Sequence, residues 1–228
     1  MDPITRPMFM GAAGATLPKI GDFYEGGYFA GYISHTANGN ATHGLIVAPK
    51  ASGSSESQLQ WKTTNTTTFG TSSEYDGAAN TANMANSEHP AANYCAGLTI
   101  NGYSDWYLPA LYELEIAYYN LKPTTDSNEI DEPGYGTNSY AVPQRSSNYT
   151  AGDPAQTSVA AFQAGNFGEE DGREYFGANG YWSSTESSIS NDPATRTYAW
   201  MLDFQNGEQI LKFKTTGQRV RAFRKFAV

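Results

Sequence analysis

Apolar residues cluster towards the two ends of the chain, in short runs divided by turn residues. Residues 23–33 alternate aromatic and small side chains around a Gly-Gly pair, and the run "LIVAP" at 45–49 stops at a proline. From 197 to 226 apolar and polar residues alternate again, with the hairpin turn sequence Asn206-Gly207 inside the run. The pattern predicts strands at both ends of the chain.

The middle of the chain carries one clear helical period. Apolar side chains recur there at the spacing of a single helix face, at Leu111, Leu114, Tyr118 and Leu121. Pro109 suits the first turn of this helix, and Pro123 ends it. A short helix is expected near residues 75–85 and a helical turn or two within 157–165. The rest of 51–83 and 124–180 reads as long polar loops, with Trp61 as an isolated apolar anchor.

Side-chain alternation assigns faces to the C-terminal strands. Period two places Trp200, Leu202 and Phe204 on one face, with Ile210 across the turn. In the last strand Val220, Ala222 and the stem of Arg224 share a face, and Phe223 lies on the other. No internal repeat or linker divides the chain. We therefore expect one α+β domain over residues 20–228, preceded by an arm over residues 1–19.

The arm is apolar and rich in Gly and Ala, in the run "MFMGAAGAT". The run is short, and Pro3 and Pro7 lie beside it, so a cleaved secretion signal is the less favoured interpretation. We expect a retained, ordered assembly arm that contacts a neighbouring subunit or a larger particle. Its attachment side chains are predicted to be Met8, Phe9 and Met10.

Several motifs occur in a fixed order along the chain: "GDFYEGGYFAGYI", "HGLIVAP", "GYSDWYLPALYEL", "YWSSTE", "AWMLDFQNGEQ" and "RVRAFRKF". This succession resembles the Lcl C-terminal domain family of bacterial surface proteins and bacteriophages, from about Ile20 to Phe226. The resemblance implies a C-type-lectin-like fold, in which the two chain ends pair in one sheet and the main helix packs on that sheet.

The resemblance also implies structural roles for the large and basic side chains. It favours the protein core, rather than ligand contact, for three tryptophans: Trp106, Trp182 and Trp200. It makes "RVRAFRKF" the closing strand, whose arginines are expected to pair with internal carboxylates such as Glu113 or Glu186. These arginines are Arg219, Arg221 and Arg224.

Charge and composition exclude two classes of partner. The formal net charge of -9 opposes sequence-independent nucleic-acid binding, which needs a cationic surface. No apolar run approaches the length of a membrane span. Aromatic residues, including 16 tyrosines, indicate a core that is aromatic rather than aliphatic.

The residues offer little for catalysis or metal binding. Cys95 is the only cysteine, so neither a disulfide nor the cysteine pair of the related formylglycine-generating enzymes is possible, and we expect it to be buried. His35, His43 and His89 show no metal-ligand spacing. The acidic groups at 169–171 and 131–132 read as solvated loops. We expect no enzyme activity, no cofactor and no metal site.

Recognition is the remaining chemistry. The segment from Ser183 to Tyr198 is a polar run bracketed by two tryptophans, and the loops from 135 to 181 combine Tyr, Ser, Gly and Asn as antibody paratopes do. A displayed loop is the favoured interpretation, and a solvated loop without a partner is the alternative. The candidate ligand-binding residues are Ser187, Ser190, Asn191, Thr195, Arg196 and Tyr198.

These observations give a leading hypothesis of a bacteriophage virion protein. The arm would attach it to capsid, tail or fibre proteins, and the head would bind a host-surface receptor or glycan without a cofactor. A structural decoration protein without receptor binding is the alternative, and a bacterial surface adhesion module is a third. A homo-oligomer is expected, with a trimer as the guess.

Overall fold

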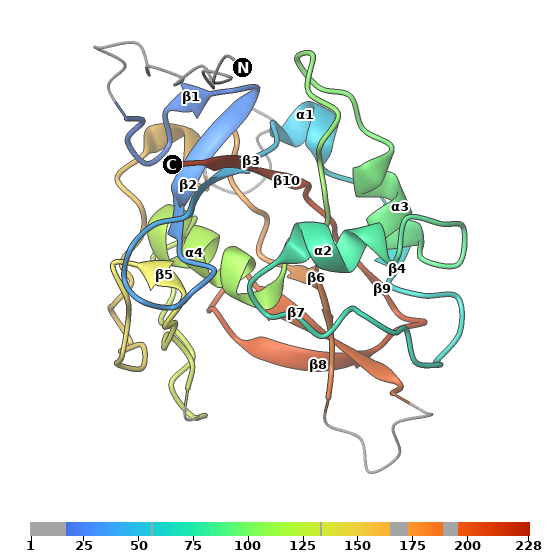
Figure 1. Cartoon of the computed structure of the whole chain (residues 1–228). Helices are drawn as coiled ribbons and strands as arrows, with labels where there is room; N and C mark the ends of the chain where they lie inside the picture. The colour runs from blue at the N-terminus through green and yellow to red at the C-terminus, as the bar shows by residue number, and fades with distance from the viewer. Residues whose placement is uncertain (1–16, 56, 133, 165–172, 189–195) are drawn as a thin grey trace, which may run out of the picture.

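The computed structural model describes residues 17–55, 57–132, 134–164, 173–188 and 196–228. Strands from both ends of the chain form its first sheet, in the antiparallel order β1-β2-β3-β10, with β5 on β2 (Figure 1). The strands are β1 (Phe23–Tyr24), β2 (Gly27–Ile33), β3 (His43–Val47), β5 (Ala141–Val142) and β10 (Phe223–Ala227). The predicted pairing of the two chain ends in one sheet is confirmed.

A second sheet of three antiparallel strands has the order β6-β7-β8. It contains β6 (Gly180–Glu186), β7 (Tyr198–Asp203) and β8 (Gln209–Phe213), beside a small pair of β4 (Leu59–Gln60) and β9 (Gly217–Gln218). The predicted turn joins β7 to β8: the Gly207 N–H donates to the Asp203 carbonyl, and Gly207 has φ +79, which favours glycine.

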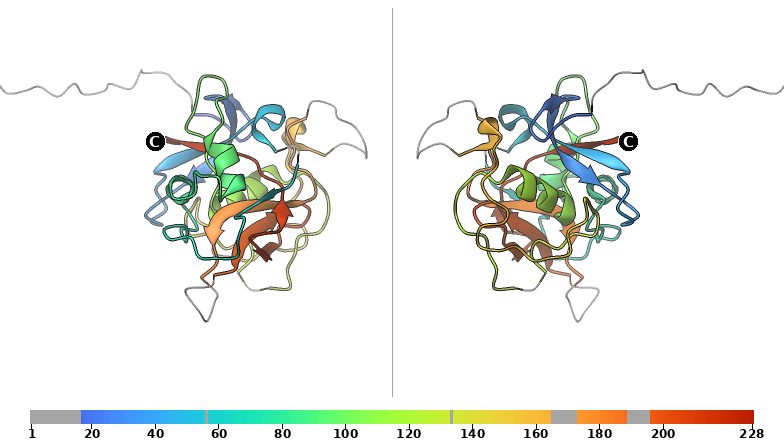
Figure 2. Two further views of the ribbon diagram at one scale, coloured as in Figure 1. Left: turned by 90° about the vertical axis from the view of Figure 1, so that its right-hand side faces the viewer. Right: turned by 90° about the vertical axis from the view of Figure 1, so that its left-hand side faces the viewer.

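Within the described residues, four α-helices complete the α+β fold, beside a 3-10 turn at Ala160–Phe162: α1 (Lys50–Gly53), α2 (Gly77–Ala82), α3 (Pro90–Ala96) and α4 (Leu111–Leu121). α4 is the predicted main helix, and it lies between the sheets, contacting β2 on one side and β6 and β7 on the other (Figures 1 and 2). Pro109 lies before its cap residue Ala110, not in the first turn, because the Glu113 carboxylate accepts the Ala110 N–H. α3 was not predicted; Pro90 opens it.

Two apolar clusters form the core. α4 contributes Leu114 and Tyr118 to one, and Trp61, Trp106 and Trp182 lie in the other, each at most 2% exposed. Trp200 is only half-buried, so its predicted core role is wrong. Residues 199 and 201 of β7 face the tryptophan cluster, whereas residue 200, two positions after the first residue of the strand, lies on the opposite face.

The C-terminal arginines pair with carboxylates, but not with the predicted ones. Buried Arg221 binds Glu174 at 2.7 Å, and Arg224 binds Asp105 at 2.8 Å. Glu113 has no arginine partner among the described residues, and Glu186 pairs with Lys214. Arg219 Nε is buried without a hydrogen bond to any described residue. Long loops bring the actual partners to the closing strand, and the sequence pattern does not place loops.

Candidate binding surface

One face of the β7–β8 hairpin carries an exposed aromatic side chain, Phe213, and two half-buried ones, Tyr198 and Trp200. Tyr198 is directly opposite Phe213, and Trp200 is opposite Leu211, so alternation places all four on the same face. The rings of Tyr198 and Phe213 lie 4.7 Å apart, and Phe213 is 47% exposed. The opposite face, with Ala199, Met201 and Ile210, packs into the tryptophan cluster.

A threonine-rich segment at 63–70 lies against the start of this hairpin. The Arg196 N–H donates to Thr67 Oγ1 at 3.3 Å. This hydrogen bond joins the segment to Arg196, two residues before β7 begins. Phe69 follows two residues later and is 86% exposed. We call these residues the hairpin surface: exposed Phe69 and Phe213, and half-buried Arg196, Tyr198 and Trp200.

A buried carboxylate fixes the base of the hairpin surface. Glu186 ends β6 with its side chain 1% exposed, and its Oε1 accepts the Thr68 N–H at 2.7 Å and an ion pair from Lys214. Its Oε2 lies 3.5 Å from Arg196 Nη1. The Glu186 side chain therefore connects β6 to Thr68 of the threonine-rich segment and to Arg196 of the hairpin surface.

Two buried lysines complete this base. Lys214 Nζ donates to the Thr66 carbonyl at 2.8 Å and lies 4.8 Å from the centre of the Trp61 ring. Lys62 Nζ donates to the Thr67 carbonyl at 3.0 Å and to Thr68 Oγ1 at 3.1 Å. Burial lowers the pKa of Lys214, and the neighbouring Glu186 carboxylate opposes that shift. We call Lys62, Thr68, His89, Glu186 and Lys214 the Glu186 cluster.

His89 closes the Glu186 cluster from α3. Its Nε2 lies 2.9 Å from Thr68 Oγ1, and its ring meets Trp61 edge to face at 5.5 Å. Burial, together with the nearby Lys62 ammonium, lowers the pKa of His89 to about 4. The histidine is therefore neutral at pH 7.

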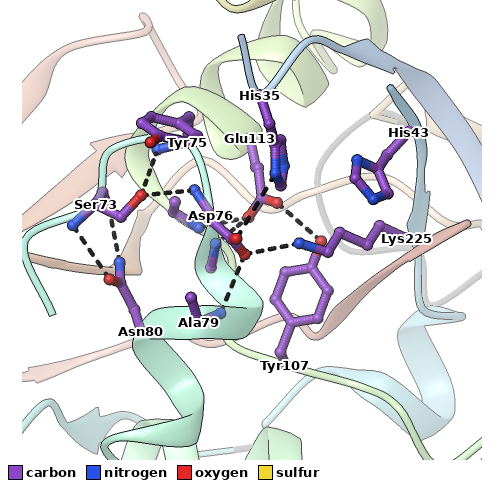
Figure 3. A network of polar contacts seen from close by, with 12 residues as sticks. His35, His43, Ser73, Tyr75, Asp76, Ala79, Asn80, Tyr107, Glu113 and Lys225 are labelled. Carbon is purple, nitrogen blue, oxygen red and sulfur yellow. Dashed lines mark hydrogen bonds and ion pairs between the residues drawn. The ribbon is translucent and has the colours of Figure 1, made fainter. Parts of the chain in front are cut away.

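A second polar network joins the N-terminus of α2 to the C-terminal strand (Figure 3). Asp76 caps α2 by accepting the Ala79 N–H at 3.1 Å, and the same oxygen accepts Lys225 Nζ of β10 at 2.7 Å. The other oxygen of Asp76 lies 3.7 Å from His35 Nδ1. We call His35, His43, Asp76, Glu113 and Lys225 the α2 network.

Glu113 is the buried carboxylate of the α2 network, with no exposed surface. It accepts the N–H groups of Ala110 at 2.7 Å and Gly77 at 3.2 Å, and the Tyr107 hydroxyl at 2.9 Å. Burial raises the pKa of Glu113 to about 7, and these donors limit the shift. The side chain joins the first turns of α2 and α4.

The fold brings together two histidines whose sequence positions suggested no relation. His35 and His43 have ring centres 4.5 Å apart, and Figure 3 shows both beside Lys225. Burial lowers the pKa of His35 to about 4, with a further contribution from Lys225. Within the described ranges, no group of three or more His, Cys, Asp or Glu side chains could hold a metal ion. The contacts of the α2 network are internal, which fits a structural role.

Comparison with protein-family models identifies the family to which this domain belongs. The model of the Lcl C-terminal domain matches residues 54–224, which is most of the chain. The chain belongs to the Lcl C-terminal domain family. No curated protein matches it.

The family match covers the whole hairpin surface and the Glu186 cluster. It begins later than the Ile20 expected from the motifs, so β1, β2 and β3 lie outside the matched range. Cys95 lies within the Lcl C-terminal domain and is fully buried, and burial raises the pKa of its thiol far above the usual value. No helix among the described residues is long and apolar enough to cross a membrane.

The structure places only some of the predicted binding residues. Arg196 and Tyr198 lie on the hairpin surface. Ser187 is 1% exposed, and its N–H donates to the Tyr198 carbonyl at 3.0 Å, so it belongs to the paired stem and its predicted place in the displayed part is wrong. Ser190, Asn191 and Thr195 lie outside the described residues, as do the arm residues Met8, Phe9 and Met10.

The threonine-rich segment is the part of the site that the sequence pattern did not reveal. Its run "TTNTTTF" begins two residues after Trp61, and the phenylalanine stands alone among polar side chains. The sequence signal for this segment was a single aromatic residue, Phe69, in a polar run that follows a tryptophan. Its position beside Arg196 depends on the long-range contact with Glu186, which no local pattern contains.

Proposed function

We propose that this protein is a bacteriophage virion protein whose Lcl C-terminal domain binds a host-surface molecule through the hairpin surface. The binding is non-covalent and uses no cofactor. The ligand is a receptor or glycan of the host envelope. The proposal extends the family assignment, which by itself gives the domain and not its partner.

The observation that carries the proposal is a set of exposed aromatic rings above a buried ionic base. Phe69 and Phe213 are 86% and 47% exposed; the Phe213 ring lies 4.7 Å from that of Tyr198, and Phe69 follows Thr67, whose hydroxyl accepts the Arg196 N–H, by two residues. Exposed apolar side chains that gather beside polar groups mark interaction sites. Aromatic and arginine side chains provide most binding energy at such sites, because they bury a large area with few torsions to fix.

The placement of the N-terminal strand supports attachment at one end and display at the other. β1 and β8 lie at opposite ends of the domain in Figure 1. Phe23 of β1 is 58% exposed, and Leu17, which precedes it, is 68% exposed. An arm that leaves near β1 and contacts other virion proteins would leave the hairpin surface free for the host.

The test is adsorption of phage that carry the triple variant Phe69→Ala, Arg196→Ala and Tyr198→Ala. A matched control carries Ile130→Ala and Val228→Ala, which remove two exposed apolar side chains, 53% and 54% exposed, outside both the hairpin surface and the attachment end. We expect intact particles whose adsorption rate falls about tenfold or more with the triple variant. The control should adsorb normally.

The alternative is a decoration protein, and the exposed Leu17 and Phe23 are the observation that favours it. In that case the triple variant would adsorb like the parent phage. Deletion of residues 1–19 would release the protein from particles under both functions. Loss of particle stability on that deletion, combined with normal adsorption of the triple variant, would replace receptor binding with decoration.

A further inference from the structure

The outer edge of β8 pairs with no other strand in the part of the chain that the structure describes. β8 is an edge strand of its sheet, since the order is β6-β7-β8 among the described residues. The Lys214 N–H donates to the Thr197 carbonyl, and the Asp203 N–H donates to the Glu208 carbonyl. The hydrogen-bonded pairs are therefore those of the even-numbered residues of β8, and the backbone groups of 209, 211 and 213 point away from β7.

These outward groups are only partly used. The Gln209 carbonyl accepts the Tyr135 hydroxyl at 3.0 Å and keeps a second lone pair, and the Phe213 carbonyl accepts the Thr216 N–H at 2.9 Å. Leu211, in the middle, directs both its N–H and its C=O to the open edge. An unpaired edge of this kind is a template for another strand.

The charges on β8 determine which strand fits. Glu208 and Lys212 lie four residues apart on one face, roughly 13 Å along the strand, and no ion pair joins them among the described contacts. Half-buried Ile210 lies midway between them. An antiparallel strand of the same sequence as β8, centred on Ile210, therefore places a lysine opposite Glu208, an isoleucine opposite Ile210 and a glutamate opposite Lys212.

We propose that β8 pairs with β8 of a second copy of this chain, antiparallel, around a two-fold axis at Ile210. Gln209 and Leu211 of each copy then exchange backbone hydrogen bonds, four in all by the pairing pattern. Each Lys212 lies directly opposite Glu208 of the other copy. The contact is isologous, so it closes as a dimer.

The surroundings of Glu208 favour a lysine from outside. Burial raises the pKa of Glu208, the carboxylates of Glu129 and Asp203 raise it further, and the Lys212 ammonium of the same chain only partly opposes the rise. A second ammonium opposite Glu208 opposes both effects. Lysine on an open edge ordinarily prevents strand pairing, and here the register gives that lysine a carboxylate partner.

The test is sedimentation velocity of the purified chain between about 1 and 100 µM, the range in which weak self-association appears. Glu208→Lys and Lys212→Glu each place like charges opposite one another and should weaken the dimer about tenfold or more. The double exchange Glu208→Lys with Lys212→Glu restores opposite charges and should restore the dimer. Lys19→Glu with Glu88→Lys, an exposed pair elsewhere, is the matched control and should have no effect.

Leu211→Pro supplies a second variant that does not depend on charge. It removes an outward N–H and no hydrogen bond to β7, so the fold should persist while the dimer is lost. Urea midpoints of all variants check the fold. A chain that is monomeric throughout, or an oligomer that neither charge reversal nor Leu211→Pro changes, overturns the proposal. The readout needs no host, so it is independent of receptor binding.

Discussion

The α2 network and the Glu186 cluster use similar residues for different ends. Each contains a buried carboxylate, a histidine of lowered pKa and a lysine. In the α2 network the contacts join α2, α4 and β10, and no exposed aromatic residue lies in it. In the Glu186 cluster they hold the backbone of 66–68, directly beneath Phe69 and Arg196. The difference shows that a buried ion network can serve the fold or present a surface, depending on what it holds.

The largest expected difference in the free energy of unfolding is between substitutions of Lys214 and Lys225. Lys214→Met leaves the fully buried Glu186 carboxylate without its closest cation and should lower the free energy of unfolding by about 3–5 kcal/mol. Lys225→Met breaks a pair whose side chains are 19% and 24% exposed, and about 1 kcal/mol is expected. Urea unfolding at pH 7 measures both. Equal losses would remove the distinction between the two clusters.

Acid should act on both regions through their histidines. The pKa values of His35 and His89 are about 4 in the folded protein, below the ordinary 6.5, so the unfolded chain binds protons more readily. The stability that this provides is complete above pH 6.5 and is lost as the pH falls towards 4. Urea midpoints between pH 7 and 4.5 should show the loss.

His89→Gln and His35→Gln separate the two contributions. Each substitution should reduce the acid-induced loss of stability. Because both folded pKa values are about 4, the two reductions should be of similar size. A pH profile that is unchanged in His89→Gln would contradict the burial argument.

The opposite sign is expected for Glu113. Its pKa rises from the ordinary 4.5 to about 7 in the folded protein, so its contribution to stability is complete below pH 4.5 and is lost as the pH rises through 7. Glu113→Gln should flatten the fall in urea midpoint between pH 5 and 8. A slope equal to that of the parent chain would show that the donors around Glu113 outweigh its burial.

The smallest expected change in the free energy of unfolding is for an exposed residue of the hairpin surface. Phe69→Ala removes a side chain that is 86% exposed, and the free energy of unfolding should change by less than about 0.5 kcal/mol. Phe204→Ala, a buried residue stacked on Phe176, should cost about 3–5 kcal/mol. A large loss from Phe69→Ala in urea unfolding would make that residue structural.

The sequence predicted the parts of the fold that local pattern controls. The helical period gave α4, the Asn206-Gly207 turn gave the β7–β8 hairpin, and alternation gave the two faces at Val220 and Phe223. The prediction for Trp200 was wrong because side-chain alternation assigns residues to two faces of a strand. It does not show which residues along one face are buried. α3 lacked an apolar period and depends on its tryptophan-cluster contacts.

The candidate site was predictable only in part. Arg196 and Tyr198 followed from the polar run before Trp200, because that run had to leave the core. The segment at 63–70 lies more than a hundred residues earlier, and its position depends on Glu186 and Lys214. Ion pairs between distant residues leave no periodic trace, which also explains the wrong partners expected for Arg221 and Arg224.

The most direct test of the central claim is hydrogen exchange of the protein with and without purified host envelopes. The account predicts that added envelopes slow backbone exchange at residues 63–70 and 196–200, with little change at the α2 network or β1. The triple variant of the hairpin surface should lose this protection, and the Ile130→Ala and Val228→Ala control should keep it. Protection confined to β1 and its neighbours, or none at the hairpin surface, would contradict the account.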